Sequence, residues 1–351
     1  MKNTKPLNSE VATLADVAQI ACVSTATVSR CLNNPVQVSD KTRQRVMKAV
    51  TTLNYSPNFG ARALAAKRTN TYGAIIPTME NAIFARGLQA FEQVLVSRGA
   101  TMLVASSSYD PQIEEDQIRT LIARGADGLL LIGRDREPAV YRFLRERNVP
   151  FVIAWTSATA PETSHVGFDN LAASRALAAR AIGLGHRQIG FISAGLNFND
   201  RARDRVEGVR LAMRDHGLDS NCMPIIETRY SIACGRAAMA AIMTDHPETT
   251  LVMCGNDVLA VGAVQGAHLL GLRVPDDVSI TGFDDIELAT IIRPALTTVH
   301  VPHHTMGTMA AETLLEMVRE GATARQIVLE TSIVERESLS APGMKPLSRP
   351  A

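Results

Sequence analysis

Small side chains surround Arg30 near the start of the chain: Thr25, Ala26, Thr27 and Ser29. A helix with small side chains can enter the major groove of DNA, which is about 12 Å wide. An arginine on that helix can donate to guanine O6 and N7, or it can bind a phosphate. The pattern predicts a helix that reads DNA. The alternative is that these are ordinary helix-surface residues.

A second basic group lies far along the chain, where Arg201, Arg203 and Arg205 alternate with other residues. If two of these arginines face one cleft, they could bind a carboxylate or a phosphate through paired hydrogen bonds. Under that interpretation the ligand is a sugar acid. The alternative is that Arg201 and Arg203 are solvated and only Arg205 binds ligand.

Catalytic motifs are missing from the sequence. Gln188 stands where the dinucleotide fingerprint beginning at Gly183 requires glycine, and the sequence has neither a phosphate-binding P-loop nor a G-x-S-x-G motif. Three histidines within residues 300–304 could suggest a metal, but no nearby carboxylate or cysteine completes a ligand set. We therefore expect no enzyme activity, no metal and no cofactor.

Composition indicates a globular protein of two or three domains. The chain has 351 residues, of which 46% are hydrophobic and 20% charged. Its longest apolar runs fall well short of the ~20 residues that span a bilayer. The five cysteines include no C-x-x-C pair, and residues 1–10 are too polar for a signal peptide. These features favour a reducing, cytoplasmic location.

Charge is distributed unevenly along the chain. Residues 1–70 contain ten Lys and Arg against three Asp and Glu, whereas the remainder contains 26 against 32. A basic N-terminal block is typical of proteins that bind polyanions, because neutralising phosphates releases counterions. Taken alone, the block could also be solvated surface.

The first 60 residues have helical periodicity. Thr13, with Asp16 three residues later, forms a capping-box pattern, and Ser24 and Ser39 are expected to cap two further helices. Two short helices joined by a tight turn and followed by a third make a helix-turn-helix module. The expected helices span residues 14–21, 25–32 and 40–53.

From Tyr72 onward, short apolar runs alternate with amphipathic stretches, which is typical of parallel sheets covered by helices on both faces. The number of runs indicates two α/β lobes, whose ligands would lie at the carboxyl ends of the strands. Residues after Ser338 are expected to be disordered. The expected strands lie in residues 73–77, 101–106, 128–133, 151–155, 189–193, 251–254 and 278–283.

The motifs resemble one known family. From Thr13 to Leu64 the chain reads T-L-A-D-V-A-x-x-A-x-V-S-x-x-T-V-S-R-x-L-N, V-S-x-x-T-R-x-x-V and L-N-Y-x-P-N-x-x-A-R-x-L. This sequence is similar to the DNA-binding head of the LacI/GalR family of bacterial transcription regulators. Later pieces, such as G-N-D-x-x-A-x-G at residues 255–262, resemble the family's periplasmic-binding-protein-like core of two lobes.

The resemblance implies a division of the chain into a head, a hinge and two lobes. It also implies a homodimer that binds a pseudo-palindromic double-stranded DNA operator and responds to a small-molecule effector. The implied parts are a helix-turn-helix head (1–57), a hinge helix and linker (58–70), an N-lobe (71–168 and 299–329), a C-lobe (169–298 and 330–343) and a tail (344–351).

The resemblance also assigns DNA-binding residues. Leu64 would insert between base pairs in the minor groove and kink the duplex. Gly60 departs from the helix-forming residue that is usual in the family, which disfavours the hinge helix. The implied DNA-binding residues are Thr13, Ser24, Thr25, Ala26, Thr27, Ser29, Arg30, Asn33, Tyr55, Asn58, Arg62 and Leu64.

Effector residues are implied at strand ends that face the cleft between the lobes. Trp155 replaces an aspartate that is common in the family, which argues against an ordinary hexose. Asp169 and Asn170 could either contact ligand or cap a helix. The implied effector residues are Asn81, Phe84 and Trp155 in the first lobe, and Arg201, Arg205, Tyr230, Asn256 and Asp284 in the second.

Together these observations predict an allosteric, DNA-binding transcriptional repressor controlled by a sugar or sugar acid. Two rival classes are a sugar-binding module without a DNA role and a sugar-processing α/β enzyme. The basic head and the polar N-terminus argue against the first, and the missing catalytic motifs argue against the second.

Overall fold

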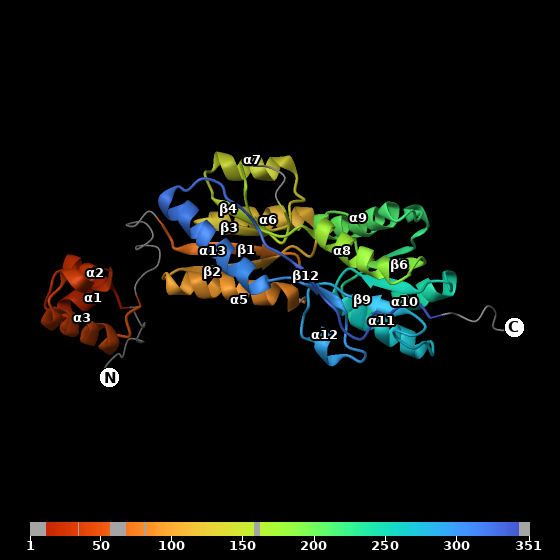
Figure 1. Ribbon diagram of the computed structural model, residues 1–351. Helices are drawn as coiled ribbons and strands as arrows, with labels where there is room; N and C mark the ends of the chain where they lie inside the picture. Colours follow the sequence, from red (N-terminus) through yellow and green to blue (C-terminus); the bar gives the residue numbers. More distant parts are fainter. Residues whose placement is uncertain (1–11, 34, 57–67, 81, 158–161, 344–351) are drawn as a thin grey trace, which may run out of the picture. The chain divides into compact units, whose positions relative to one another are not determined.

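The computed structural model divides the chain into two compact units, Met1–Thr69 and Asn70–Ala351, which we call the head and the core. Figure 1 follows both units along the sequence. The structure describes residues 12–33, 35–56, 68–80, 82–157 and 162–343.

The head is a helix-turn-helix followed by a third helix, as the sequence predicts. Val17, Val28 and Val46, one from each α-helix, are fully buried and pack in a common core. Burying one apolar stripe per helix fixes the three helices against one another. The elements are α1 (Leu14–Ile20), α2 (Thr25–Asn33), the 3-10 helix η1 (Pro35–Gln37) and α3 (Asp40–Thr52).

The helix caps of the head largely match the predictions. The Thr13 hydroxyl accepts from the Asp16 amide at 3.3 Å, and the Asp16 carboxylate accepts from the Thr13 amide at 2.8 Å, which is a complete capping box. Ser24 accepts from the amide three residues later at 3.1 Å. The prediction for Ser39 is wrong in its mechanism, because this hydroxyl donates to Thr42 Oγ1 at 3.0 Å and caps no backbone amide.

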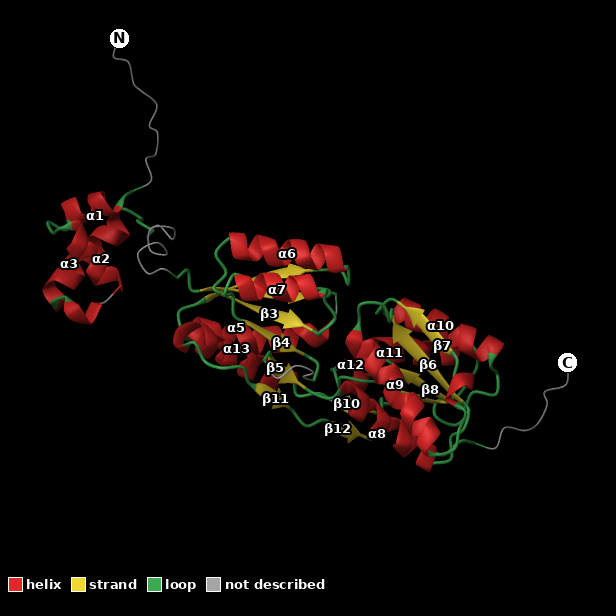
Figure 2. Cartoon of the chain, turned by 90° about the horizontal axis from the view of Figure 1, so that it is seen from above, coloured by secondary structure: helices red, strands yellow, loops and turns green. Residues whose placement is uncertain are grey.

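The first lobe of the core is a parallel sheet in the order β11-β5-β4-β3-β1-β2. Helices α5 and α13 cover one face, and α6 and α7 cover the other (Figure 2). Its strands are β1 (Thr71–Ile76), β2 (Thr101–Ser106), β3 (Gly128–Ile132), β4 (Phe151–Ala154), β5 (Ser164–Gly167) and β11 (Gln326–Val328). Its helices are α5 (Ala82–Ser97), α6 (Pro111–Ala123), α7 (Pro138–Glu146) and α13 (His303–Glu320).

The second lobe is a parallel sheet in the order β7-β6-β8-β9. Helices α8 and α9 pack together on one face, and α10 and α11 on the other. Its strands are β6 (Ile189–Ala194), β7 (Ile225–Thr228), β8 (Leu251–Cys254) and β9 (Ser279–Thr281). Its helices are α8 (Asn170–Gly183), α9 (Asp200–Asp215), η2 (Ser220–Cys222), α10 (Ile232–Asp245), α11 (Asp257–Leu269) and α12 (Leu288–Ile291).

Two segments that connect the lobes pair with each other as a short antiparallel ribbon. Strand β10 (Thr298–His300) pairs with β12 (Ser332–Val334). Beyond this ribbon Ser340 contacts the second lobe: its carbonyl accepts from His186 Nε2 at 2.8 Å, and its amide donates to the Ser279 hydroxyl at 3.2 Å. The expectation of disorder directly after Ser338 is therefore wrong for residues 339–343.

Five strands were not among the expected apolar runs: β5, β7, β10, β11 and β12. Strands β7 and β11 lie at sheet edges, and β11 and β12 are largely exposed, so they need no continuous apolar sequence. Strand β5 is fully buried but contains the polar residues Ser164 and His165, so its sequence is not a continuous apolar run.

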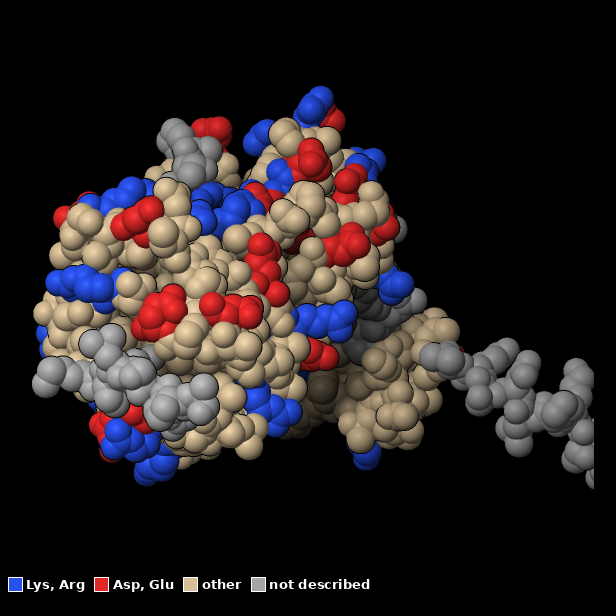
Figure 3. All heavy atoms as spheres, turned by 90° about the vertical axis from the view of Figure 1, so that its right-hand side faces the viewer, with Lys and Arg blue, Asp and Glu red and all other residues tan. Residues whose placement is uncertain are grey.

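Acidic and basic side chains are interspersed on the face of the molecule drawn in Figure 3. Among the described residues, none of the helices is both long and apolar enough to cross a membrane.

Candidate functional site

The outward face of α2 carries three of the residues predicted to contact DNA. Thr25, Ala26 and Arg30 are exposed, whereas Val28 and Cys31 are buried in the core of the head. Ala26 and Arg30 are four residues apart and therefore share one face of the helix. A helix with small side chains on its outward face is narrow enough to enter a major groove, and the Arg30 guanidinium on that face could then reach the base edges.

The other predicted DNA-binding residues differ in exposure. Thr13 and Ser24 are exposed at helix starts, Thr27 and Ser29 are half-buried, and the Tyr55 side chain is buried in the core of the head. The Thr13 hydroxyl and amide lower the pKa of the Asp16 carboxyl by hydrogen bonding. Outside the described residues lie Asn58, Arg62, Leu64 and Asn81, together with the side chain of Asn33.

Helix α3 adds positive charge to the exposed surface of the head. Lys41, Arg43, Arg45 and Lys48 are all exposed, and Arg43 forms an ion pair with Asp40 at 2.9 Å. Such cations can neutralise phosphates without reading sequence.

In the core, Arg205 of α9 is buried and contacts three separate segments. Its Nε donates to Asn170 Oδ1 at 2.9 Å, and its Nη1 donates to the Gly255 carbonyl at 2.5 Å. Its Nη2 lies 3.5 Å from Asp284 Oδ1, and its guanidinium stacks 3.8 Å above the Phe283 ring. These contacts fix the guanidinium plane, while the long bond to Asp284 leaves that carboxylate able to accept from another group.

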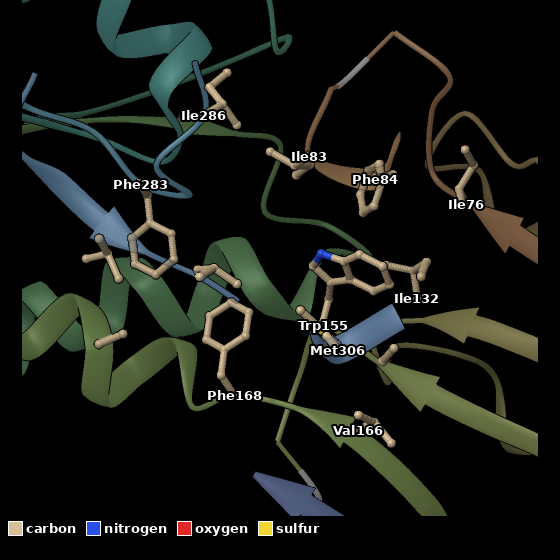
Figure 4. Packing of buried hydrophobic residues seen from close by; sticks show 14 of the residues in the cluster. Ile76, Ile83, Phe84, Ile132, Trp155, Val166, Phe168, Phe283, Ile286 and Met306 are labelled. Carbon is tan, nitrogen blue, oxygen red and sulfur yellow. The ribbon is translucent and has the colours of Figure 1, made fainter. Parts of the chain in front are cut away.

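Trp155 and His303 belong to the first lobe, and His303 faces Asp284 of the second. Trp155 Nε1 donates to His303 Nδ1 at 3.1 Å, so the imidazole proton lies on Nε2. Burial lowers the pKa of His303 and keeps the ring neutral, although Asp284 opposes the shift. His303 Nε2 lies 3.9 Å from Asp284 Oδ1, which is beyond hydrogen-bond distance. In Figure 4 the Trp155 ring points toward Phe84, whose centroid is 5.6 Å away.

Arg134 of the first lobe forms a bridge to α9 of the second. Its backbone amide donates to Asp200 Oδ2 at 3.0 Å, and its Nη2 donates to both Asp204 oxygens at 2.8 Å. Asp200 is completely buried and also pairs with Arg201 at 2.9 Å. Burial alone would raise the pKa of Asp200, but the Arg201 charge and the Arg134 contacts lower it. Burial raises the pKa of Asp204, although the Arg134 charge opposes that shift. Among the two carboxyl groups of the bridge, it is therefore Asp200 whose ionised form is stabilised.

The three arginines have different surroundings. Arg201 and Arg205 are 7% and 3% exposed, whereas Arg203 is exposed and pairs with Asp135 at 2.6 Å. The alternative that both Arg201 and Arg203 are solvated is therefore wrong for Arg201, which is buried. It is correct for Arg203, which is exposed. Two guanidinium groups approach the cleft from one helix.

Two tyrosines meet across the cleft. Tyr109 follows β2 in the first lobe and Tyr230 follows β7 in the second, with ring centroids 6.1 Å apart and planes inclined by 41°. Burial raises the pKa of both hydroxyls, against the opposing charges of Arg201 and Arg205. Both phenols are therefore protonated and able to donate.

Three buried polar atoms near the facing ends of the two lobes have no hydrogen-bond partner among the described residues. They are Asn256 Nδ2, Asp284 Oδ2 and His303 Nε2. The Asn256 carbonyl oxygen is already used in capping α11, where it accepts from Leu259 at 2.9 Å. Buried polar groups are normally paired, and leaving one unpaired costs about 1–3 kcal/mol. Two donors and one acceptor are thus available to a polar ligand.

Backbone strain is concentrated in the same region. Of the ten non-glycine residues with positive φ in the described chain, six lie in loops that meet at the cleft. Left-handed backbone costs such residues about 1–2 kcal/mol each, and it persists where the surrounding structure enforces it. The six are Ser108, Tyr109, Trp155, Phe198, Asp284 and Asp285.

Most of the described effector candidates lie at the expected position: Trp155, Tyr230, Asn256 and Asp284 follow the carboxyl ends of strands, and Phe84 and Arg201 lie in the first turn of the next helix. Arg205 lies one turn further along α9. Sequence reasoning missed Tyr109 and His303 as cleft residues. For Asn170 it left two roles open, and the structure shows a third: Asn170 orients Arg205, while Asp169 caps α8 through the Ala172 amide at 2.9 Å. The histidine spacing at 300–304 was the available signal for His303.

The histidines do not assemble into a metal site. His300 pairs with Asp285 at 2.9 Å, whereas His303 is directed at Trp155. Within the described ranges, no three His, Cys, Asp or Glu side chains are grouped as metal ligands would be.

Comparison with known proteins places both units. Residues 13–58 match the model for bacterial regulatory proteins of the lacI family, and residues 178–339 match that for a periplasmic binding protein-like domain. The chain is 34% identical over 332 residues to the ribose operon repressor of Haemophilus influenzae, covering 94% of this chain and 99% of that protein.

Solved structures agree with these matches. A LacI family transcriptional regulator from Silicibacter pomeroyi is 29% identical, with a TM-score of 0.85 over 94% of this chain and 99% of that one. The lac repressor dimer bound to operator and the anti-inducer ONPF is 26% identical, with a TM-score of 0.83 over 95% of this chain and 100% of that one.

Proposed function

Because the chain belongs to the LacI family of bacterial regulatory proteins, we propose that it is a transcriptional repressor whose operator affinity is controlled by a small molecule. The effector is a sugar or sugar acid bound between the two lobes of the core. The repressor acts as a homodimer on a pseudo-palindromic operator in the cytoplasm, by analogy with the lac repressor dimer bound to operator.

The observation that carries the effector proposal is the set of buried, unpartnered groups at Asn256, Asp284 and His303. A hydroxyl can both donate to the Asp284 carboxylate and accept from the amide and imidazole N–H groups. Vicinal hydroxyls therefore satisfy all three groups, which favours a polyhydroxylated ligand. The buried guanidinium of Arg201 favours a ligand that also carries a carboxylate.

Control of DNA binding follows from where the cleft lies. A ligand that contacts both lobes binds the closed core more tightly than the open core and shifts the equilibrium between them. That shift changes operator affinity by the coupling free energy, typically about 1–3 kcal/mol.

The DNA-binding proposal is tested by selecting bound duplexes from a random pool with the purified full chain at ~0.15 M salt. We expect enrichment of a palindrome with a central C-G step. A true binding module without a DNA role would enrich nothing, with or without added sugars.

Arg30→Ala provides the matching variant, and Lys48→Ala on α3 is its control. Arg30→Ala should abolish the preference for the selected operator, because it removes a base-reading group from α2. Lys48→Ala removes the same charge elsewhere on the head and should weaken all duplexes alike. Equal loss of preference in both variants would remove the assignment of Arg30.

The effector proposal is tested by fluorescence of Trp155, the single tryptophan in the chain. We would titrate D-ribose and D-gluconate and repeat both titrations with Arg201→Met. D-Gluconate should change the emission of the parent protein and should bind Arg201→Met with lower affinity. The affinity of D-ribose, a neutral sugar, should be the same for both proteins. Equal affinities in both proteins would exclude the carboxylate contact.

A further inference from the structure

The ring of Trp155 occupies a slot that a glycine leaves open. Gly87 of α5 is buried, and a Cβ at this position would lie 2.5 Å from the indole atoms Cζ2 and Cη2. Carbon atoms in contact are normally about 3.5–4.0 Å apart, so any larger residue at position 87 would displace the ring. The His303 carbonyl oxygen lies 3.2 Å from the same position, so the start of α13 closes the slot from another side.

The backbone of Trp155 is fixed as well. Its φ of 63° is left-handed, a conformation that a large side chain adopts only where the surroundings enforce it. Asn170 Nδ2 donates to the Trp155 carbonyl at 3.0 Å, while Asn170 Oδ1 accepts from Arg205 Nε at 2.9 Å. The direction of the indole is therefore set both at its ring and at its backbone.

The hydrogen-bonding capacity of the Trp155 side chain is used within the protein. An indole has a single N–H group, and this group donates to His303 Nδ1 at 3.1 Å. The two rings are stacked, with planes inclined by 28° and centroids 6.2 Å apart. The remainder of the indole is buried in the same apolar cluster as Phe84, Ile132 and Met306 (Figure 4). Trp155 thus has no polar atom left for a ligand.

His303, in contrast, keeps one nitrogen for another group. Its Nε2 is buried without a hydrogen-bond partner among the described residues and lies 3.9 Å from Asp284 Oδ1. Burial lowers the pKa of His303, the charges of Arg205 and Arg86 act in the same direction, and Asp284 opposes them. A neutral imidazole can carry its proton on either nitrogen. The indole N–H removes that choice, because Nδ1 must accept and only Nε2 can donate.

We propose that Trp155 is a positioning residue, which fixes the proton of His303 on Nε2 and does not itself contact the effector, and that Gly87 admits its ring. The inference rests on the proposed function only in calling the ligand of Nε2 an effector. The first lobe then offers a fixed donor and selects a ligand with an acceptor oxygen at this point. A ligand group that can only donate, such as an ammonium, is rejected because two donors would face each other.

The tautomer of His303 is measured without ligand or DNA, so its failure is distinguishable from failure of the proposed function. The full chain is labelled with ¹⁵N-histidine, and His303→Gln identifies the signals of His303 among the eight histidines. In the parent we expect a ring protonated on Nε2 alone. Trp155→Phe keeps a buried aromatic ring but removes the N–H, so the ratio of Nε2-protonated to Nδ1-protonated ring should fall by about tenfold, the equivalent of one hydrogen bond.

Phe91→Leu is the matched control, because Phe91 is a fully buried aromatic residue of the same cluster with no contact to His303 among those described. It should keep the tautomer of the parent. A single Nε2 tautomer in Trp155→Phe overturns the proposal, and so does an equal change in Phe91→Leu, which would show general loosening. If Trp155→Phe does not fold, the parent decides, since a mixture of tautomers there rejects the fixed donor.

The slot is tested by combining Gly87→Ala with Trp155→Phe. Gly87→Ala alone should displace the indole, shift its emission to longer wavelength and lower the urea midpoint. A phenyl ring lacks the two atoms that the new Cβ would meet, so Gly87→Ala should lower the midpoint less in the Trp155→Phe background. Equal losses in both backgrounds would reject the role of Gly87.

The claim that Trp155 acts through His303 is tested by calorimetric titration of D-gluconate. Trp155→Phe should weaken binding by about two- to tenfold in the parent and should have no further effect in a His303→Ala background. The same loss in both backgrounds would show that Trp155 contacts the ligand directly and would overturn the proposal. If D-gluconate does not bind the parent, the sugar-acid proposal fails, and the tautomer of His303 alone decides the role of Trp155.

Discussion

Removing the Arg134 side chain should open the core. This guanidinium donates to both oxygens of Asp204 at 2.8 Å and lies 3.5 Å from Asp200 Oδ2, so it joins the first lobe to α9 of the second. Arg134→Ala removes these contacts but keeps the backbone amide that donates to Asp200 at 3.0 Å. The substitution also removes the hydrogen bond that Arg134 Nη1 donates to the Thr156 hydroxyl, so it reports on the whole side chain and not on the backbone contact.

The size of the effect follows from burial. The side chains of Arg134, Asp200 and Asp204 are 24%, 0% and 18% exposed, so the bridge is mostly shielded from solvent. Hydrogen bonds between charged groups contribute about 1.5–3 kcal/mol when buried. Asp200 retains Arg201 as a partner, which limits the loss to about 1–2 kcal/mol, a five- to thirtyfold shift toward the open core.

Hydrogen exchange of the amide at position 134 measures this shift directly, because that amide is protected by a bond across the lobes. Its exchange rate should rise by about five- to thirtyfold in Arg134→Ala. Arg119→Ala is the matched control: it removes an exposed ion pair to Glu115 within the first lobe at 2.6 Å, which contributes about 0.3–0.5 kcal/mol.

Unchanged exchange at position 134 in Arg134→Ala would refute the reasoning, because the bridge would then contribute nothing to closure. An equal increase in Arg119→Ala would refute it as well, since the effect would not depend on contacts between the lobes.

Three further predictions concern the core. In Gly307→Ala the added Cβ would lie 2.0 Å from the Gly87 carbonyl oxygen, so the free energy of unfolding measured in urea should fall by about 1–3 kcal/mol. Gly183→Ala is the control: its Cβ would meet open space, so the free energy of unfolding should be unchanged or slightly higher. Burial raises the pKa of Asp257 to about 8 from 3.8, so the native state binds the extra proton and the free energy of unfolding should fall as pH rises from 3.8 to about 8. Asp257→Asn should flatten that dependence in urea titrations, and an unchanged slope would contradict the assignment. Arg205→Ala should abolish the fluorescence response to effector while operator binding survives in a gel-shift assay; a normal response would exclude Arg205 from the site.

The sequence predicted the features that depend on neighbours along the chain. The capping box at Thr13 and Asp16 and the cap at Ser24 involve residues three positions apart, so both could be identified from spacing alone. The buried parallel strands were visible as apolar runs for the same reason. Prediction failed at β5 and at the exposed edge strands, where burial depends on neighbours in space.

The candidate site was only partly visible from the sequence. Resemblance to a family indicated Arg205, Asp284 and Trp155. It could not indicate that Asn170 holds Arg205 in place, nor that His303 turns toward Trp155. Tyr109 gave no signal, because a tyrosine in a polar loop has many conformations and nothing local selects the left-handed one.

The sequence by itself determined the head helices, the strand runs and the family. Only the tertiary structure decided which polar groups meet. Trp155 and His303 are 148 residues apart, and Arg205 and Asp284 are 79 apart. Contacts over such separations depend on strand order and on the closure of two lobes. Local sequence patterns indicate neither the strand order nor the closure of the lobes. The hydrogen bonds and the periodicity within one helix or strand are the same whatever elements pack against it.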